Sequence, residues 1–381
     1  MNISRRKSIA VLGGGVIFAA GGAAGYSVTR KPQTAFLPWQ TAGSYQDPRM
    51  RALSYAVLAP NPHNQQPWIV DLKTPDAVVV YADTTRLLPE TDPYNRQITI
   101  GLGCFLELMR IAALEDGLEV RFDLFPEGSN HMALDERPVA LCRFEPTTAT
   151  RDQLFAQIPH RRTLKEPYDV SRPLPRETLQ RIAKAAIHGS RVSITDVPED
   201  VQAFCDLSAE AFLIELRTER TYKESVDLFR IGHKEVDANP DGIDLSGPMF
   251  ESLRMAGLFS RETAVDRDSM SYKSGEAMVL ANVTTAAAHL WQVTPGNSRQ
   301  EQIRAGQDWV RINLAATAEG VGLQPLSQGL QEYPEMADIY KTLHDTLAPN
   351  GGTVQMWCRL GYGPDVPESP RWPLEAKLKN A

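Results

Sequence analysis

Hydrophobic and polar residues follow two different spacings along the chain, one typical of helices and the other of strands. The helical spacing recurs in residues 51–59, 103–118, 179–186 and 306–321. Short apolar runs typical of strands occupy residues 68–72, 138–144, 191–196 and 354–360. Helix, strand, helix and strand therefore follow one another twice, which predicts an α+β protein built from two similar halves.

The repeat is visible in the residues as well as in the order of elements. Residues 111–118 (IAALEDGL) match residues 314–321 (LAATAEGV) at a shift of 203 (314 − 111). Cys142-Arg143 matches Cys358-Arg359 at a shift of 216 (358 − 142). Such matching predicts a duplicated supersecondary unit, although the period is far longer than in solenoid repeats.

The second half is longer than the first. Aligning Val70 with Ile194 gives a shift of 124 (194 − 70), which leaves 79 extra residues (203 − 124) before the second central helix. We expect the first half at residues 45–150 and the second at 155–372, with a lid-like insertion at about 228–275. Insertions of this size are usually lids or binding loops, and a surface excursion is the alternative.

The amino terminus, residues 1–30, predicts export. Arg5-Arg6 precedes the uncharged, glycine-rich run Ala10 to Gly25, which is typical of a twin-arginine signal. Ser8 stands where a large apolar residue is usual, and the run is short for a membrane span. We expect the export machinery as a partner and a periplasmic protein, either cleaved or anchored outside the inner membrane. A buried amino-terminal helix is the alternative.

Composition excludes several classes of protein. Forty basic and 47 acidic side chains leave a formal charge of −7, so no nucleic-acid partner is expected. A composition of 42% hydrophobic and 23% charged residues is that of a globular protein. The four cysteines never form CxxC, the seven histidines are scattered, and HExxH, GxSxG and P-loop motifs are missing, so we expect neither a metal site nor a serine hydrolase.

Three strings carry candidate chemistry. Residues 59–68 (APNPHNQQPW) join a helix to a strand, and their amides suit a polyol or a heteroaromatic ring edge. Residues 160–167 (HRRTLKEP) offer paired arginines and a hydroxyl that can hold a phosphate. Residues 318–329 (AEGVGLQPLSQG) end a helix in a glycine-bearing loop that lets backbone approach a flat ligand. Each string also has a purely structural explanation as a turn, a solvated surface or a helix cap.

Together the strings resemble the FMN-dependent nitroreductase superfamily, most closely its Acg-like branch of tandem FMN-binding oxidoreductases. The resemblance covers roughly residues 50–371. It implies an α+β fold of two nitroreductase-like halves, each a mixed sheet flanked by helices, that form an intrachain pseudo-dimer. In the family the flavin lies between two subunits, so here we expect it between the halves of one monomer.

The two halves have lost complementary parts of the site. The first half keeps the Asn/Gln/Pro turn but has Asp47 to Arg51 in place of Arg-Arg-Thr. The second half keeps Arg-Arg-Thr but has Ile187 to Ser190 in place of the turn. The resemblance therefore implies one complete FMN site and one degenerate site.

The resemblance also implies the role of each residue. Arg161 and Arg162 would meet the FMN phosphate, Thr163 the phosphate or ribityl chain, and Lys165 the N1 and O2 edge, where a cation stabilises the reduced anion. Arg371 matches a second phosphate contact, with Arg359 as its rival. The residues lining the ring and ribityl would be Pro60, Asn61, Pro62, Asn64 and Gln66, with Asn61 departing from the usual Ser; the loop near N5 would use Gly322, Pro325, Leu326, Ser327 and Gln328.

The expected function is an FMN oxidoreductase that reduces a nitro compound, a quinone or another electron-poor small molecule. Lys165, Ser327 and Gln328 are the candidate catalytic residues. The alternative is a flavin-storing or redox-sensing protein whose lid covers the FMN and prevents turnover. The electron donor is not identified by the residues.

Overall fold

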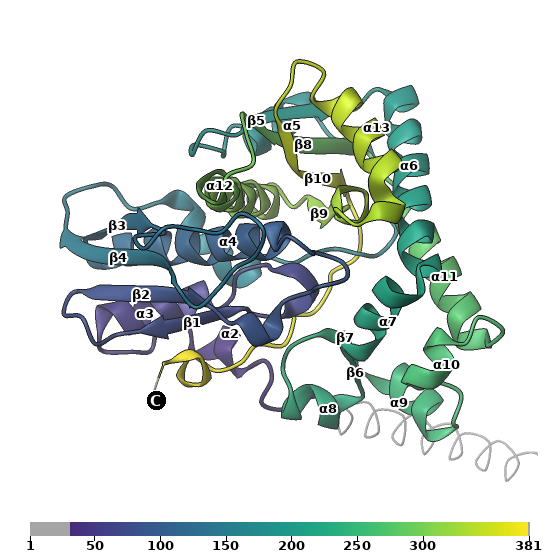
Figure 1. The fold of residues 1–381 in the computed structure, drawn as a ribbon, viewed down its shortest axis with the longest axis horizontal. Helices are drawn as coiled ribbons and strands as arrows, with labels where there is room; N and C mark the ends of the chain where they lie inside the picture. The colour runs from purple at the N-terminus through teal and green to yellow at the C-terminus, as the bar shows by residue number, and fades with distance from the viewer. Residues whose placement is uncertain (1–30, 380–381) are drawn as a thin grey trace, which may run out of the picture.

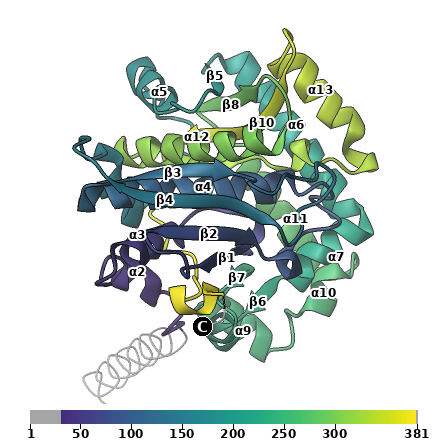
Figure 2. The same cartoon turned by 60° about the vertical axis from the view of Figure 1, so that its left-hand side comes forward.

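The computed structural model describes residues 31–379, so the predicted export signal at residues 1–30 lies outside the described part. Two four-stranded sheets enclose a pair of long helices, α4 (Arg96–Ala113) and α12 (Arg299–Ala318) (Figures 1 and 2). A main hydrophobic core combines residues of both sheets and both helices. The α+β class expected from the sequence is confirmed.

The first sheet has the strand order β1-β2-β4-β3. Its half contains α2 (Leu37–Thr41), α3 (Pro48–Ala56), β1 (Trp68–Asp71), β2 (Ala77–Ala82), β3 (Leu118–Leu124) and β4 (Pro138–Pro146), with the short 3-10 turns η1 (Pro62–Asn64), η2 (Thr84–Arg86) and η3 (Leu114–Asp116). The helix α4 connects the second strand to the third.

The second sheet repeats this plan with the order β5-β8-β10-β9. Its half contains η4 (Gln153–His160), α5 (Arg176–Ala183), β5 (Arg191–Thr195), β8 (Ala288–Thr294), β9 (Gly322–Pro325), η5 (Gln328–Leu330), η6 (Pro334–Met336), α13 (Ala337–Leu347), β10 (Thr353–Gly361) and η7 (Leu374–Lys377). The first-half strands β1, β2, β4 and β3 thus correspond in position to β5, β8, β10 and β9.

The extra residues of the second half lie between β5 and β8. They form α6 (Pro198–Arg217), α7 (Glu219–Asp227), β6 (Phe229–Ile231), α8 (His233–Ala238), β7 (Ile243–Leu245), α9 (Pro248–Met255), α10 (Arg261–Val265) and α11 (Met270–Val283). Strands β6 and β7 pair in parallel as a small separate sheet. Figure 1 shows this insertion, from α6 down to α8 and α9, along one side of both halves.

Two sequence expectations are corrected by the strand pairing. The four-stranded sheets are antiparallel throughout rather than mixed. The hydrophobic pattern of the sequence shows only two strands per half, one on either side of a helix. This order favours parallel pairing. The unrecognised strands β2, β3, β8 and β9 are those that make every pair antiparallel.

The register corrects the alignment of the first strands as well. Val70 pairs with Val80, which pairs with Ala140, and Val192 pairs with Gln292, which pairs with Met356. Val70 therefore corresponds to Val192, at a shift of 122 (192 − 70), and not to Ile194. The second half accordingly carries 81 extra residues (203 − 122) before its central helix. A two-residue error preserves the inward and outward alternation of a strand, so the pattern alone could not detect it.

The two central helices cross at a point that the repeat makes symmetric. A Cβ on Gly103 would lie 2.1 Å from the carbonyl oxygen of Ile303, and a Cβ on Gly306 would lie 2.0 Å from that of Ile100. Both glycines and both isoleucines are related by the shift of 203 (306 − 103 and 303 − 100). Glycine at both positions allows the helix backbones to touch, which brings the two halves into one core.

Within residues 31–379, one helical stretch, Arg96–Asp116, is apolar and long enough to cross a membrane. Its apolar window is 89% buried inside the protein, as expected for the central helix of a packed core.

Candidate functional site

The turn between α3 and β1 is held in a strained conformation. Three residues of this turn that are not glycine have positive φ: His63 (47°), Asn64 (54°) and Gln66 (51°). Inside the turn, the Asn61 Oδ1 accepts the N–H of Gln66 at 2.7 Å. Backbone strain of this kind costs about 1–3 kcal/mol per residue and is concentrated at functional sites. The turn predicted to line a ligand is therefore rigid and costly to form.

Other segments brace the turn on several sides. A Cβ on Gly101 of α4 would lie 3.1 Å from the Cβ of Asn61, so the glycine lets the helix approach. The Gln66 side chain donates to the carbonyl of Pro240 at 2.7 Å and accepts the N–H of Trp372 at 2.8 Å. The turn thus meets both the insertion and the carboxyl-terminal segment.

Two buried arginines lie beside this turn with unused donors. Arg161 and Arg371 are each 2% exposed, and each donates to the carbonyl of Leu58. The Nε and Nη1 of Arg161 and the Nε of Arg371 have no hydrogen-bond partner among residues 31–379. Leaving such donors unpaired in a protein interior is costly, so the geometry suits an anion that would bind both guanidinium groups.

The electrostatics of the cluster agree with an anion site. Burial and the field of Arg162 lower the pKa of Arg161 to about 10. Burial, followed by the fields of Arg161 and Arg162, holds the pKa of Arg371 well below its usual range. Burial is the larger cause for both arginines, and the neighbouring guanidinium charges add to it.

Arg162 is the best-supported member of the cluster. Its Nη2 donates to the Glu368 carboxylate at 2.7 Å, and its Nη1 donates to the carbonyls of Pro159 and Arg161. Its guanidinium lies 4.8 Å from the centre of the Trp39 ring, and that of Arg371 lies 5.4 Å from the same ring. Trp39 and Glu368 therefore help to hold the cluster in place.

Arg359, the rival of Arg371 for the phosphate, has a different role. It is fully buried, and it donates to Gln324, to Thr285 and to the carbonyls of Lys165 and Glu166. Its guanidinium also lies 3.9 Å from the Tyr168 ring centre. With its donors used in this way, Arg359 tethers the Lys165 stretch, and the arginine that lies with Arg161 is Arg371.

Lys165 lies close enough to His63 for its charge to act on the imidazole. The lysine side chain is solvent-accessible, yet protein surrounds it closely enough that burial lowers its pKa, while the field of Asp244 raises it. Burial, and then the field of Lys165, lower the pKa of His63 to about 4, so this imidazole is neutral at pH 7. The His63 Nδ1 is buried and finds no partner within the described chain.

The glycine-bearing loop packs against the same stretch. The N–H of Leu164 donates to the carbonyl of Leu323 at 3.1 Å. The half-buried Thr163 and the exposed Lys165, on either side of Leu164, therefore lie beside β9. A Cβ on Gly322 would lie 2.4 Å from Leu164 Cδ2, so glycine permits this contact. Pro325, the last residue of β9, pairs with Cys358 of β10.

The end of the loop is anchored from both halves. The N–H of Leu326 donates to the carbonyl of Trp357 at 2.8 Å, and Gln97 of α4 donates to the carbonyl of Ser327 at 3.3 Å. Gln328 shares a hydrogen bond with the buried carboxyl of Glu215 in α6. Burial raises the pKa of Glu215 to about 7.

The structure thus brings most of the predicted residues together. Arg371 donates to the Asn64 Oδ1, and Arg161 and Arg371 donate to the same carbonyl, that of Leu58. Pro60 and Pro62 flank the same strained turn. Sequence reasoning missed His63, Asp244 and Glu215. His63 stood inside a recognised string, whereas Asp244 and Glu215 come from the insertion, which matches no motif.

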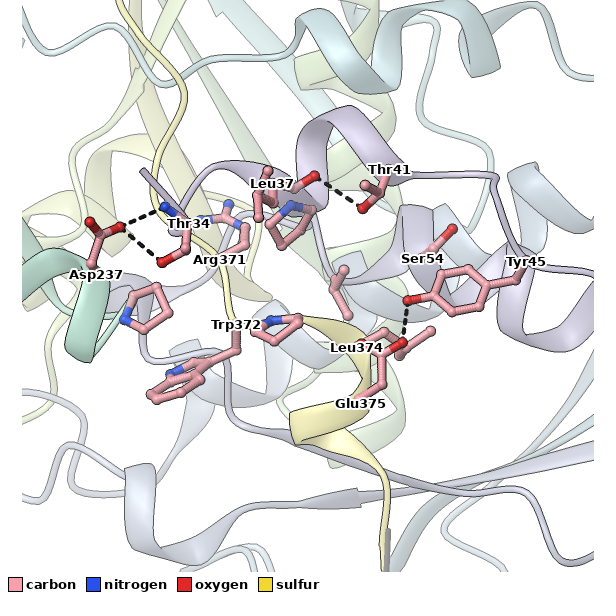
Figure 3. A pocket seen from close by; sticks show the side chains of 14 residues that line it. Thr34, Leu37, Thr41, Tyr45, Ser54, Asp237, Arg371, Trp372, Leu374 and Glu375 are labelled. Atoms are coloured by element: carbon pink, nitrogen blue, oxygen red, sulfur yellow. Dashed lines mark hydrogen bonds between the residues drawn. The ribbon is translucent and has the colours of Figure 1, made fainter. Parts of the chain in front are cut away.

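A separate pocket of about 280 Å³ lies on the outer side of Arg371 (Figure 3). Leu37, Trp372 and Leu374 give it largely apolar walls. Asp237 accepts hydrogen bonds from Thr34, and Tyr45 donates to Glu375, as the dashed lines in Figure 3 show. The pocket adjoins the arginine cluster but does not include Lys165 or the strained turn.

No known family profile matches the chain. Rv3131 of Mycobacterium tuberculosis is 24% identical over 341 residues, which are 85% of this chain and 91% of the relative. Acg of the same organism is 24% identical over 338 residues, or 85% and 93% of the two chains. Both carry the provisional name NAD(P)H nitroreductase.

Solved structures give weaker matches. A provisionally named nitroreductase of Anabaena variabilis aligns over 87% of this chain and 92% of its own, at 11% identity and TM-score 0.45. NfnB of Mycobacterium smegmatis, named an FMN-dependent nitroreductase and solved with NADPH, aligns over 59% and 96%, at 16% identity and TM-score 0.34. The fold therefore rests on the strand order above. In sequence, most of the chain is similar to proteins named as nitroreductases.

Proposed function

We propose that the protein is an FMN-dependent oxidoreductase that holds one FMN between its halves and reduces a nitro compound, a quinone or another electron-poor small molecule. The observation that carries this proposal is the pair of buried arginines, Arg161 and Arg371, whose free donors lie beside a strained amide-rich turn. A phosphate supplies the missing acceptors, and the turn supplies amides for a flat polar ring. The relatives' names agree with this class of reaction.

The residues present fit an FMN. Arg161 and Arg371, supported by Arg162, would hold the phosphate through charge-assisted hydrogen bonds. Lys165 would face the polar edge of the ring, and the 325–328 loop would present backbone to it. When bound, FMN supplies two-electron transfer between a donor and an acceptor, a chemistry that side chains lack.

The protein's own groups would tune and shield that chemistry. Lys165 places a positive charge near the turn that carries His63, and this charge favours a negatively charged ring. The neutral His63 adds no second charge beside it. The strained turn keeps its amides in position before any ligand arrives, which lowers the entropy cost of binding.

The second candidate is flavin storage or redox sensing without turnover. The insertion reaches the ligand turn directly, since Gly242 N–H donates to the Asn64 carbonyl at 3.3 Å and Gln66 donates to Pro240. A segment held there restricts entry of a second molecule. Steady-state turnover with a panel of nitro compounds and quinones separates the two functions: oxidation of the reduced protein by none of them supports storage.

The first test is the absorbance spectrum of the purified protein, with the released flavin identified and counted. We expect one FMN per monomeric chain. Two flavins per chain, or binding that requires a dimer, would contradict a single intrachain site.

The electron donor is tested by anaerobic reduction. NAD(P)H is a candidate because the relatives carry NAD(P)H in their names. Bleaching of the flavin by NADPH or NADH supports that donor, whereas bleaching only by a quinol supports a donor from the membrane.

We also propose export by the twin-arginine route to the periplasm or to the outer side of the inner membrane. The support is Arg5-Arg6 before the uncharged Ala10–Gly25 run. Replacing both arginines by lysine should retain the protein in the cytoplasm, as fractionation would report. Unchanged export of that variant would contradict the assignment.

A further inference from the structure

Exposed apolar side chains are concentrated on three short helices of the insertion. Among residues 31–379, twelve large hydrophobic side chains are exposed, and six of them lie within residues 249–278, which contain α9, α10 and α11. These six are Met249, Met255, Leu258, Val265, Met270 and Met278. Single exposed apolar residues are ordinary, whereas a concentration of them marks an interaction surface.

Three of these residues come from neighbouring backbone, where α9 ends and α11 begins. Met255 is the last residue of α9, and Leu258 follows three residues later. The carbonyl of Leu258 accepts a hydrogen bond from the Ser271 hydroxyl at 2.7 Å, and Met270 precedes Ser271 at the start of α11. Met255, Leu258 and Met270 are 64%, 62% and 76% exposed, and we call these three residues the apolar patch.

The segment that carries the patch is held by the rest of the insertion. Phe259, next to Leu258, packs against Phe250 and Phe229, with ring centres 5.3 and 6.3 Å away. Ser260, the following residue, caps α10. The exposure of the patch is therefore a property of a folded surface.

The charges around the patch are nearly balanced. Residues 249–278 contain four Lys or Arg and five Asp or Glu side chains. A surface of this composition has no net attraction for anionic groups such as phosphates. Its affinity for a partner must come from apolar burial, which salt does not screen.

The amino-terminal end of the described chain is attached close to the patch. Asp237 of α8 accepts the N–H groups of Thr34 and Ala35 at 2.8 and 3.0 Å. The first residue of α8 is joined to α9, because the His233 N–H donates to the Glu251 carboxylate at 2.9 Å. Figure 1 shows α8 and α9 next to each other. In α9, Glu251 is one helical turn from the patch.

We propose that the apolar patch is a membrane-contact surface that rests on a lipid bilayer. The uncharged run Ala10–Gly25 precedes the described chain, and the nine residues from Gly25 to Thr34 (34 − 25) span at most about 30 Å. A bilayer that holds this run is therefore within reach of the patch. One apolar signal gives only marginal membrane binding, whereas two together give stable attachment. This inference does not depend on the proposed FMN function.

The first experiment maps which methionines a bilayer covers. The full chain is treated with hydrogen peroxide, with and without phosphatidylcholine vesicles, and methionine sulfoxide is measured at each position by mass spectrometry. Met270 should oxidise several-fold more slowly when vesicles are present. Met132, which is 51% exposed in the first half, is the internal control and should oxidise at one rate.

Two outcomes of this experiment would overturn the proposal. Met270 oxidation that vesicles leave unchanged would show that the patch stays in water. Slow oxidation of Met270 even without vesicles would show that another part of this chain, or a second copy, already covers the patch.

The second experiment measures vesicle binding by flotation. The full chain with Leu258→Asp and Met270→Asp should bind phosphatidylcholine vesicles several-fold more weakly than the wild type, because charges replace apolar groups at the contact. Met132→Asp is the matched control and should bind as the wild type does. Since all three side chains are exposed, thermal unfolding should be unchanged, which verifies that each variant is folded.

Wild-type binding should also persist at high salt. Binding that salt abolishes would indicate an electrostatic contact and overturn the proposal. Full binding by the double variant would assign attachment to the Ala10–Gly25 run alone. A double variant that converts a dimer into a monomer, with vesicle binding unchanged, would make the patch a contact between copies of the chain.

Discussion

Two turns occupy corresponding places in the repeat and have opposite properties. The turn after α3, residues 60–67, leads into β1, and the turn after α5, residues 187–190, leads into β5. The first keeps His63 Nδ1 and two arginines with unused donors at its side. The second is satisfied by one carboxylate, because Asp308 accepts the N–H groups of Ile187, His188 and Ser190 at 2.6–2.9 Å.

The charged side chains around the second turn form buried ion pairs. Glu107 is fully buried in α4, and it binds Arg110, Arg311 (3.0 Å) and His188 (3.1 Å). Burial acts to raise the pKa of Glu107, but the bonds from Arg110 and His188 outweigh it and lower the pKa to about 2. Asp152 adds a second carboxylate to Arg311 at 2.6 Å.

The contrast teaches how a duplicated site is retained or lost. Beside the first turn, buried donors are left open at a cost in stability; beside the second turn, buried ion pairs occupy the space and the guanidinium groups of Arg110 and Arg311 are paired. An arginine of the first half is also paired internally, since Arg49 binds Asp47 and the carbonyls of Leu72, Thr74 and Ala77. Unpaired buried groups, more than the presence of arginine, distinguish the copy that we propose to bind FMN.

The largest effect on stability should follow from removing the buried carboxylate beside the second turn. Glu107→Gln leaves Arg110 and Arg311 without their buried carboxylate, so the free energy of unfolding should fall by about 3–5 kcal/mol. Urea denaturation measures the change. FMN affinity, measured under conditions where the variant is folded, should be unchanged, and a loss of affinity equal to that in Arg161 variants would mean that the two copies are not independent.

The same carboxylate predicts an acid limit. Its pKa is about 2 in the folded protein and near its ordinary 4.5 in the unfolded chain, so its stabilisation is present above pH 4.5 and is lost as pH falls toward 2. The wild type should lose more stability than Glu107→Gln between these pH values. Parallel pH profiles for both proteins would contradict this.

The glycine crossing tests whether the halves are related by symmetry. Gly103→Ala and Gly306→Ala each force a methyl group against a helix carbonyl, which should cost about 3 kcal/mol in either case. Equal losses in thermal or urea unfolding are expected because the contacts are equivalent. Gly275→Ala, where no atom lies within 4 Å of the added Cβ, is the matched control and should not destabilise the protein.

Removing a buried arginine beside the first turn should have the opposite effect on stability. Arg161→Met removes a buried charge with two unpaired nitrogens, so the protein without FMN should become more stable. FMN affinity should fall about tenfold or more, since a charge-assisted bond of ~1.5–3 kcal/mol is lost. Riboflavin, which lacks the phosphate, should bind equally well to both proteins in calorimetry. Arg51→Met, at a partly exposed arginine bound to Asp116, is the control.

The smallest effect concerns Lys165. Lys165→Leu should lower the midpoint potential of bound FMN by ~30 mV for each tenfold loss of preference for the reduced form, equivalent to ~1.4 kcal/mol. Lys184→Leu, which removes an exposed lysine beside the second turn, should leave the potential unchanged. An identical potential in all three proteins would place Lys165 away from the ring.

Some features could be predicted from the sequence because their signals are local. The duplication is visible in matched residues at fixed spacing, and the structure starts its central helices at Arg96 and Arg299, again 203 apart (299 − 96). The Asn/Gln turn and the Arg-Arg-Thr stretch were recognisable because proline, amide and arginine side chains stand in short strings. Short strands such as β9 were missed because four residues carry too little periodicity to register.

The sequence by itself therefore determined the repeat of two halves and the residue types of the candidate site. The tertiary structure decided which of these groups meet: Arg371, and not Arg359, joins Arg161 at the carbonyl of Leu58. Arg161 and Arg371 are separated by 210 residues (371 − 161), and a contact at such a separation leaves no spacing that a chain pattern can reveal. Only the packing of the carboxyl-terminal segment on the strained turn and of α4 against α12 brings them together.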